Sequence, residues 1–453
     1  MRGIRFACLG ALVACGAKTA LLPGSGGGAT GSGGSSGGAG PTGPLAVLCT
    51  SAMLDGAPTP TRAYCPTRAG QAPFRGPRGP RVAWSKKPFT IDDAESFFPA
   101  QTVVDPTGRA YVMVDASPIN QQGGPNRLTA VESDGTIAWT RSFPQPQSGL
   151  TLGKDGTLWL TGPDLIGLSA DGTTVVDVPI GAPADGGFGL TPAPYGDLAI
   201  GADGTLYLAS GYAFDNAGAI ERITRSGAVL WQYSWSNADP LVSAFLLTPA
   251  DAVIDVSGGN LSKLDPAGNV AWQSFVSGGV SACDSTGDVY VLEGTGRANP
   301  SLQVVDGAGA TVRSVSLGLP QMTVDASQLA VAGDGTAVVL VADEITSPGQ
   351  TKSHVVVMAV DTALGPRWTT AFDVTLPFDP AELSAHYGVF VDAAGTVVVT
   401  AGHVAGLDLS SGSIVWTLDA PEPQSCLRPA VLGAGGSIVA TQCDGTVFLG
   451  RDP

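Results

Sequence analysis

One short sequence pattern recurs along the chain: a predicted strand, a turn built on Asp and Gly, and a second predicted strand that ends on tryptophan. It stands at 129–139 (TAVESDGTIAW), 262–272 (SKLDPAGNVAW) and 406–416 (GLDLSSGSIVW). Asp accepts hydrogen bonds from the turn backbone and Gly adopts positive φ, so each copy predicts a hairpin with a type I turn and a G1 bulge. A unit copied this often indicates a repeat architecture.

A second kind of hairpin alternates with the first, so each repeat supplies four strands. Apolar residues alternate on both sides of its turns, as half-buried strands require. With 14% charged residues, 63 Gly and 34 Pro, the composition favours short strands and tight turns, which makes the fold class all-β. Four-stranded antiparallel units repeated at this length predict a β-propeller. The second kind of hairpin stands at 102–114, 150–162, 198–210, 247–256, 279–292, 329–341 and 388–400.

The positions that close each repeat give the number of blades. Their mean spacing is about 47 residues, near the length of a propeller blade. After the last of them only a hairpin remains, at 430–450, and the first strand has no partner of its own. Joining the two makes an eighth blade from both ends of a propeller that covers 81–450, and this closes the ring. A seven-bladed ring with Trp84 outside it is the alternative. The closing positions are Trp84, Trp139, Val176, Trp231, Trp272, Val312, Trp368 and Trp416.

The spacing Asp265-x-x-Gly268-x-x-x-Trp272 resembles the tryptophan-docking repeat of the PQQ-like propellers, the eight-bladed family related to quinoprotein alcohol dehydrogenases. The resemblance implies that each tryptophan packs between neighbouring blades. This chain departs from the family pattern at its two valine slots and at Arg225, which stands where other turns have Asp. The docking residues so implied are Trp84, Trp139, Trp231, Trp272, Trp368 and Trp416.

The N-terminus resembles a bacterial lipoprotein signal. Two arginines and a short apolar run lead to Leu-Val-Ala-Cys, so residues 1–14 are expected to be removed and Cys15 to be lipidated; an ordinary secretory signal is the alternative. Residues 15–44 comprise the lipidated cysteine and a Gly/Ser-rich tether, of which 23–44 are almost wholly Gly, Ser, Ala, Thr and Pro and predict a flexible segment with a mean reach of about 25 to 30 Å. Gly16 at the second position favours the outer membrane, with the lipid as the only membrane contact.

Five further cysteines follow the expected anchor. In an oxidising compartment we expect Cys49 to pair with Cys65 and Cys426 with Cys443, which leaves Cys283 free in a strand. The segment 45–80 is then a cysteine-containing extension that either caps the ring or lengthens the tether.

Charge narrows the class of partner. The net charge of −16 and the pI of about 4.4 argue against binding of nucleic acid or anionic lipid. A protein or a glycan in the cell envelope is the expected partner of a monomeric propeller.

Candidate binding residues lie in the long connections, because the tight Asp-Gly turns all fall on one face of the ring and the long connections on the other. Rigid scaffolds commonly carry function on such loops. The connections are 115–127, 179–197, 211–218, 233–246, 343–354, 370–387 and 418–429. Their candidate aromatic and polar residues are Tyr212, Phe214, Asp215, Trp235, Phe378, Asp379, Glu382 and His386.

We favour a non-catalytic binding or scaffold role, without cofactor or metal, over an enzyme. In arrangement the chain resembles the propeller lipoproteins of the outer-membrane barrel-assembly machinery, which are not enzymes. The alternative is a periplasmic quinoprotein-like oxidoreductase, or another enzyme with its site in the central channel, and the family would then imply Ca²⁺ and pyrroloquinoline quinone. The adjacent cysteine pair of many quinoproteins is missing. His354, His386 and His403 lie in the last two blades but lack the HxH or HxxxH spacing of a metal site.

Overall fold

The computed structural model contains two compact units, 1–43 and 44–453, and every residue it describes belongs to the second. Within the described part of the chain no helix is long and apolar enough to cross a membrane. The described residues are 57, 70–72, 74–88, 98–115, 126–144, 149–180, 197–212, 217–236, 244–250, 252–257, 260–276, 280–293, 300–319, 328–347, 350–376, 387–422, 427–442 and 444–453.

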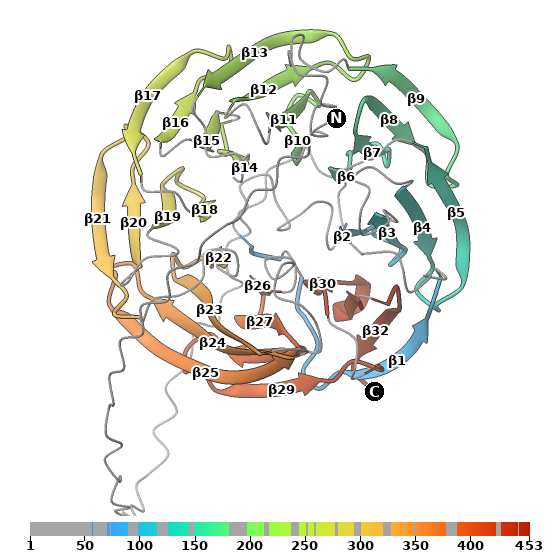
Figure 1. Cartoon of the computed structure of the whole chain (residues 1–453), viewed down its shortest axis with the longest axis vertical. Helices are drawn as coiled ribbons and strands as arrows, with labels where there is room; N and C mark the ends of the chain where they lie inside the picture. Colours follow the sequence, from blue (N-terminus) through green and yellow to red (C-terminus); the bar gives the residue numbers. More distant parts are fainter. Residues whose placement is uncertain are drawn as a thin grey trace, which may run out of the picture. The chain divides into compact units, whose positions relative to one another are not determined.

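The strands of the second unit form eight four-stranded antiparallel sheets, the blades of a propeller (Figure 1). In blades 1 to 7 the first strand along the chain lies innermost and the fourth outermost (Figure 1). Blades 1 to 4 are β2 (Phe98–Val104), β3 (Ala110–Asp115), β4 (Asn126–Val131) and β5 (Ile137–Phe143); β6 (Leu150–Leu152), β7 (Leu158–Thr161), β8 (Asp164–Leu168) and β9 (Thr174–Pro179); β10 (Asp197–Ile200), β11 (Leu206–Tyr212), β12 (Ala217–Ile223) and β13 (Val229–Ser236); β14 (Ala244–Leu247), β15 (Val253–Ser257), β16 (Asn260–Leu264) and β17 (Val270–Phe275). Blades 5 to 7 are β18 (Val280–Cys283), β19 (Val289–Glu293), β20 (Ser301–Val305) and β21 (Thr311–Ser316); β22 (Gln328–Val331), β23 (Ala337–Ser347), β24 (Gln350–Val360) and β25 (Pro366–Leu376); β26 (Gly388–Val391), β27 (Thr396–Ala401), β28 (His403–Asp408) and β29 (Ile414–Leu418).

The eighth blade joins both ends of the propeller, as the sequence predicts. Its inner three strands are β30 (Val431–Leu432), β31 (Ile438–Thr441) and β32 (Val447–Arg451), and its outermost strand is β1 (Arg81–Lys86). In Figure 1 the blue strand β1 lies beside the red strand β32. The seven-bladed alternative is therefore wrong, and Trp84 lies within the ring. The expected C-terminal hairpin at 430–450 supplies three strands, with the short 3-10 turn η3 (Ala434–Gly436) between the first two.

The turns have the predicted geometry. In blade 1 the amide of Gly135 donates to the carbonyl oxygen of Glu132 at 2.9 Å, and Gly135 has a φ of +85°. The Asp134 carboxylate accepts the Thr136 amide at 2.8 Å, and the register between β4 and β5 shifts after Ala130. This is a type I turn with a G1 bulge, which aligns the two strands with their natural twist.

Two expectations about the connections need correction. The turn at Asp444 and Gly445 joins β31 to β32, the second and third strands of blade 8, so it lies on the face opposite to the other Asp-Gly turns. The expected loop at 343–354 is strand, because β23 and β24 stay paired as far as Ser347 and Gln350. A hairpin that extends past its neighbours needs no buried face, so its polar sequence does not reveal it as a strand.

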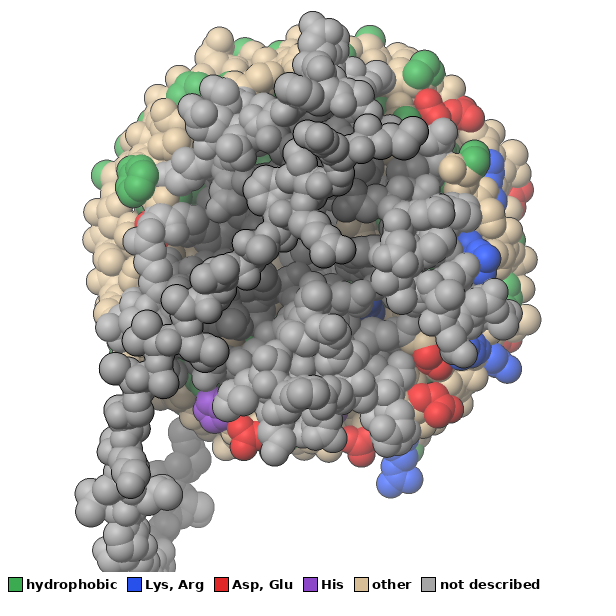
Figure 2. Space-filling model, in the orientation of Figure 1, with side chains coloured by type: hydrophobic (Ala, Val, Ile, Leu, Met, Phe, Trp, Pro, Cys, Tyr) green, Lys and Arg blue, Asp and Glu red, His purple; other side chains and the backbone are tan. Residues whose placement is uncertain are grey.

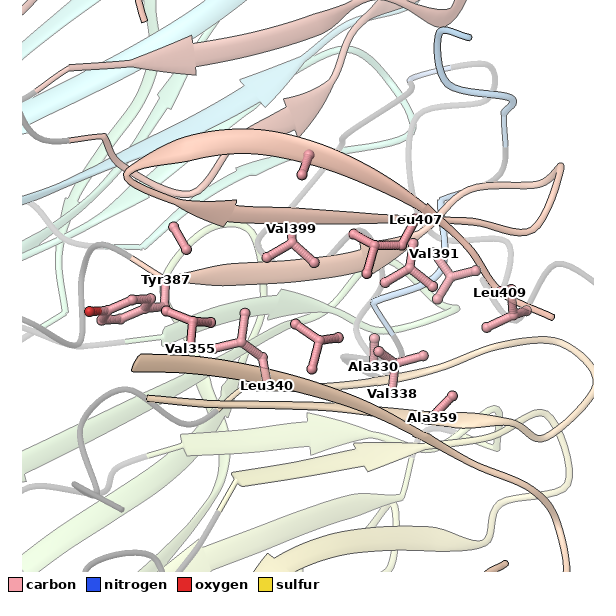
Figure 3. Close-up of a cluster of buried hydrophobic side chains, with 14 of the residues drawn as sticks. Ala330, Val338, Leu340, Val355, Ala359, Tyr387, Val391, Val399, Leu407 and Leu409 are labelled. Carbon is pink, nitrogen blue, oxygen red and sulfur yellow. The ribbon is translucent and has the colours of Figure 1, made fainter. Parts of the chain in front are cut away.

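The hydrophobic core is divided among the blade interfaces. One cluster of buried side chains lies between each pair of neighbouring blades, including the pair that closes the ring. Figure 3 shows the cluster between blades 6 and 7, where Leu340 and Val355 face Tyr387 and Val399. Because each blade buries its two faces only against its neighbours, the ring needs all of its blades to complete the core.

Candidate functional site

Two of the eight candidate binding residues lie in strands and not in loops. Tyr212 is the last residue of β11, and Trp235 is near the end of β13, two strands away in the same sheet. The structure thus brings these two positions to the same end of blade 3. The other six candidates lie outside the described residues: Phe214, Asp215, Phe378, Asp379, Glu382 and His386. The expected lipidation and disulfide residues Cys15, Cys49, Cys65, Cys426 and Cys443 also lie outside them.

The opposite, tight-turn face is built from a repeated tryptophan dock. In blade 3 the indole nitrogen Nε1 of Trp231 donates to the carbonyl oxygen of Pro266, in the outer turn of blade 4, at 3.0 Å. The indole covers Gly268 of that turn so closely that a Cβ there would lie 2.6 Å from the ring. Two independent reasons require glycine at position 268: its φ is +86°, and the indole leaves no space for a side chain.

The same dock joins four other pairs of blades, through Trp84, Trp139, Trp272 and Trp368. In every case the indole nitrogen donates to a turn carbonyl of the next blade at 2.7 to 3.0 Å, and a turn glycine lies beneath the ring. The pairs of donor, acceptor and glycine are Trp84 with Ser133 and Gly135; Trp139 with Ala170 and Gly172; Trp272 with Gly307 and Gly309; and Trp368 with Leu409 and Gly412.

Blade 2 has valine in the docking position, and an arginine from the next blade makes the connection. Val176 pairs with Gly167 in the register of the other docking residues. Arg225, in the outer turn of blade 3, reaches back to the Asp155 carboxylate of blade 2 at 2.5 Å and lies 6.0 Å from the centre of the Trp159 ring. Arg225 therefore replaces a turn aspartate with a cation that links the two blades.

In blade 5 the docking position is Arg313 and not Val312. Arg313 pairs with Val304 next to the bulge, as Trp272 pairs with Lys263 in blade 4, whereas Val312 is half exposed on the other face of the strand. The guanidinium donates to the Thr362 carbonyl in the outer turn of blade 6, so it takes over the role of the indole N–H. In that turn Leu364, with a φ of +63°, stands where the other turns have glycine.

A cavity of about 300 Å³ opens where this dock differs from the rest. It lies between blades 5 and 6 on the tight-turn face. Asp284, Asp288 and Asp334 line it together with Arg313, and the ring of Tyr290 forms part of its wall. The Tyr290 hydroxyl donates to the Gly335 carbonyl at 3.4 Å.

The carboxylates of this cavity are not equivalent. Asp284 Oδ1 accepts the amides of Thr286 and Asp288 and so holds its own turn. The Asp288 carboxylate lies 3.8 Å from the Arg313 guanidinium, beyond hydrogen-bond distance. Burial and the neighbouring Asp284 raise the pKa of Asp288 above its ordinary value. The cavity thus has more negative than positive side chains and offers room for a small positively charged group.

The described histidines do not come together as a metal site. His354 of β24 lies 2.8 Å from the Asp373 carboxylate, and His403 of β28 packs 5.5 Å from the ring of Phe372. Burial lowers the pKa of His403. His386 is outside the described part of the chain. Within that part, no group of three or more His, Cys, Asp or Glu side chains is arranged to hold a metal ion.

Comparison with known proteins agrees with this geometry. Residues 124–297, which run from β4 of blade 1 through blades 2 to 4 to β19 of blade 5, match the family model for the outer membrane protein assembly factor BamB. The structure is an eight-bladed propeller, and the matched residues 124–297 are similar to the PQQ-like repeats of that family. The PQQ-like fold supports a scaffold or binding role in general terms. No curated protein matches the chain.

Solved structures with similar folds are distant in sequence. The WD40 β-propeller domain of Doa1 is 10% identical over 83% of this chain and 97% of that chain, with a TM-score of 0.45. A quinoprotein alcohol dehydrogenase-like protein from Bacteroides thetaiotaomicron is 12% identical over 64% of this chain and 68% of that chain, with a TM-score of 0.37.

Proposed function

We propose that this PQQ-like propeller is an envelope-anchored, non-catalytic scaffold that binds a protein or glycan partner through its long-loop face. The observation that carries the proposal is that the polar groups of the opposite, tight-turn face are engaged in hydrogen bonds within and between blades. There the turn carboxylates hold their own turns, and the turn carbonyls accept indole or guanidinium donors from the preceding blade. Groups already engaged in this way contribute to stability, so the ends of the blades at Tyr212 and Trp235 are the better place for a partner.

The proposed partner surface includes the blade 3 positions Tyr212 and Trp235 and the candidate residues Phe214, Asp215, Phe378, Asp379, Glu382 and His386. Aromatic side chains with carboxylates beside them suit both peptide backbones and sugar rings. The match of residues 124–297 to an outer-membrane assembly factor favours a protein partner in the envelope.

A photo-crosslinking amino acid at position 235 tests the binding face in cells. We expect a discrete adduct from position 235, and expect it to be lost when Phe378 is replaced by Ala. The control is the same label at position 415, where Val415 is 53% exposed on the outermost strand of blade 7. Equal adducts from both positions would argue against a partner on the long-loop face.

The proposed anchor is tested separately. Cys15→Ser should move the protein from the outer-membrane fraction to the soluble periplasmic fraction, since without a lipid the tether has no membrane contact. Retention of the variant in the membrane would argue against lipidation at Cys15. The control is Cys283→Ser, because Cys283 is a free thiol buried in β18 and should not affect localisation.

The non-catalytic part of the proposal is tested by native mass spectrometry of the protein with calcium and pyrroloquinoline quinone added. A single unliganded monomer is the expected species. A stoichiometric mass increment for calcium or the quinone would instead favour the quinoprotein-like oxidoreductase.

A further inference from the structure

Residues 70–72 and 74–79, here called the strap, precede β1 and begin on the inner wall of the ring, beside Val391 of β26. Figure 1 shows the blue trace passing between blades 7 and 8 on its way to β1. Gln71 and Ala72 are fully buried. A Cβ on Gly70, which has a φ of +63°, would lie 2.7 Å from the Cβ of Ala330, so the strap begins in contact with blade 6.

The strap pairs with the free inner edge of blade 7. The Ala72 amide donates to the Val391 carbonyl at 2.8 Å, and the Val391 amide donates to the Gly70 carbonyl at 2.7 Å. This is a parallel bridge centred on Gln71 and Val391. At the turn that follows, the Ala393 amide donates to the Phe74 carbonyl at 3.0 Å. The strap therefore acts as a short fifth strand of blade 7, on the channel side.

A buried carboxylate then redirects the strap toward blade 8. Asp392 has no exposed surface; its Oδ1 accepts the amides of Ala394 and Thr396, as in the other turns. Its Oδ2 accepts the Gly76 amide of the strap at 2.6 Å. One carboxylate thus holds both its own turn and the strap, and hydrogen bonds to a charged acceptor are the stronger kind.

Two contacts fix the strap to blade 8. It crosses the first turn of that blade at Gly436, where a Cβ would lie 2.8 Å from the Arg75 carbonyl oxygen. The Asp452 carboxylate, just after β32, accepts the amides of Arg78 and Gly79 at 2.9 and 2.8 Å. Beyond this point the chain becomes β1.

The strap lies at the interface where the tryptophan dock is incomplete. The outer two strands of blade 8 come from opposite ends of the propeller, so no turn joins them and no turn carbonyl faces Trp416. Among the described residues the buried indole nitrogen of Trp416 has no hydrogen-bond partner, and the ring packs on Gly406 of its own blade. Ala72 of the strap belongs to the same buried cluster as Trp416 and Leu432.

We propose that the strap is a clasp that fastens the closing interface of the ring, between blades 7 and 8, in place of the missing tryptophan dock. It also holds residues 70–72 on the inner wall of the ring, whereas β1 lies on the rim. The proposal is independent of lipidation at Cys15 and of the partner.

Trypsin cleavage of the full chain tests the clasp, because the strap contains Arg75 and Arg78. In Gly436→Ala the added methyl group collides with the strap. The matched control is Gly435→Ala: Gly435 also has positive φ, 66° against 77°, but a Cβ there meets nothing within 4 Å. We expect cleavage after Arg75 and Arg78 to be at least about tenfold faster in Gly436→Ala than in Gly435→Ala, because opening of the strap limits the rate.

A second pair of variants keeps the test decisive if Gly436→Ala fails to fold. Asp392→Asn removes the acceptor of the Gly76 amide, whereas Asp306→Asn changes an outer turn with the same two Oδ1 bonds and no contact with the strap. Hydrogen exchange of residues 70–86 and of β29 to β32 should accelerate in Asp392→Asn and not in Asp306→Asn. Equal cleavage and exchange within both pairs would show that the strap is a passive segment and would overturn the proposal.

Discussion

At the scale of single residues, the joint between blades is a tryptophan on a glycine. Trp368 is 9% exposed, and its indole donates to Leu409 at 2.7 Å above Gly412. The sequence reveals the tryptophan, because the Asp-Gly turn and the tryptophan of one hairpin keep a nearly constant spacing, but it does not reveal that the indole covers the turn glycine of the next blade. It does not reveal the docking residue of blade 5. The adjacent Val312 and Arg313 differ only in which side of the strand they occupy, and the bulge decides that.

Trp368→Ala should lower the free energy of unfolding by about 3 to 5 kcal/mol, since it leaves a cavity at the interface and an unpaired carbonyl. Chemical denaturation measures the change. Val415→Ala, on an exposed outer strand, is the control and should cost within about 0.5 kcal/mol. Similar losses for the two variants would contradict a docking role for Trp368.

At the scale of strands and turns, the elements that belong to the repeat can be predicted from the sequence, whereas the elements outside the repeat cannot. The turn geometry follows from Asp and Gly, so the hairpins lie where the pattern predicts them. The ends of the strands have no such signal: Tyr212 and Trp235 belong to β11 and β13 because their backbones stay paired with Ala217 and Gly218 of β12. The candidate binding residues are the least predictable part of the chain, because they lie in or next to the long connections, where no sequence repeat indicates the local structure.

The interface between blades 5 and 6 provides a test of how these elements fit together. Arg313 and Leu364 replace the tryptophan and glycine of the other docks, and a leucine in the turn leaves no flat surface for an indole. Arg313→Trp alone should therefore be destabilising, and Leu364→Gly should recover part of the loss. In a double-mutant cycle we expect a favourable coupling of about 1 to 3 kcal/mol in the free energy of unfolding. Additive effects would mean that the two positions vary independently.

At the scale of the whole molecule, the turns make ring stability depend on pH. Turn carboxylates in different blades accept hydrogen bonds that lower their pKa below the ordinary 3.8: from the Thr136 side chain for Asp134, from the Asn269 backbone for Asp265, and from the Ser410 side chain for Asp408. A group whose pKa is lower in the folded protein stabilises the fold above the unfolded pKa, and this contribution is lost as pH falls through the folded value. The ring should thus lose stability progressively below about pH 4.

Asp288 provides the opposite sign within the same protein. Burial and Asp284 raise its pKa above 3.8, so its ionised form opposes folding, and the cost grows as pH rises through the folded pKa. Asp288→Asn should therefore raise the free energy of unfolding at pH 7, whereas Asp265→Asn should lower it. The Asp288 difference should shrink as pH falls through its raised folded pKa toward the unfolded value, and the Asp265 difference should shrink as pH falls below about 4 through its lowered folded pKa. Urea denaturation at pH 7 and pH 3.5 measures all four values. A loss of stability in Asp288→Asn at pH 7 would mean that its ion pair with Arg313, at 3.8 Å, outweighs the cost of burying the charge.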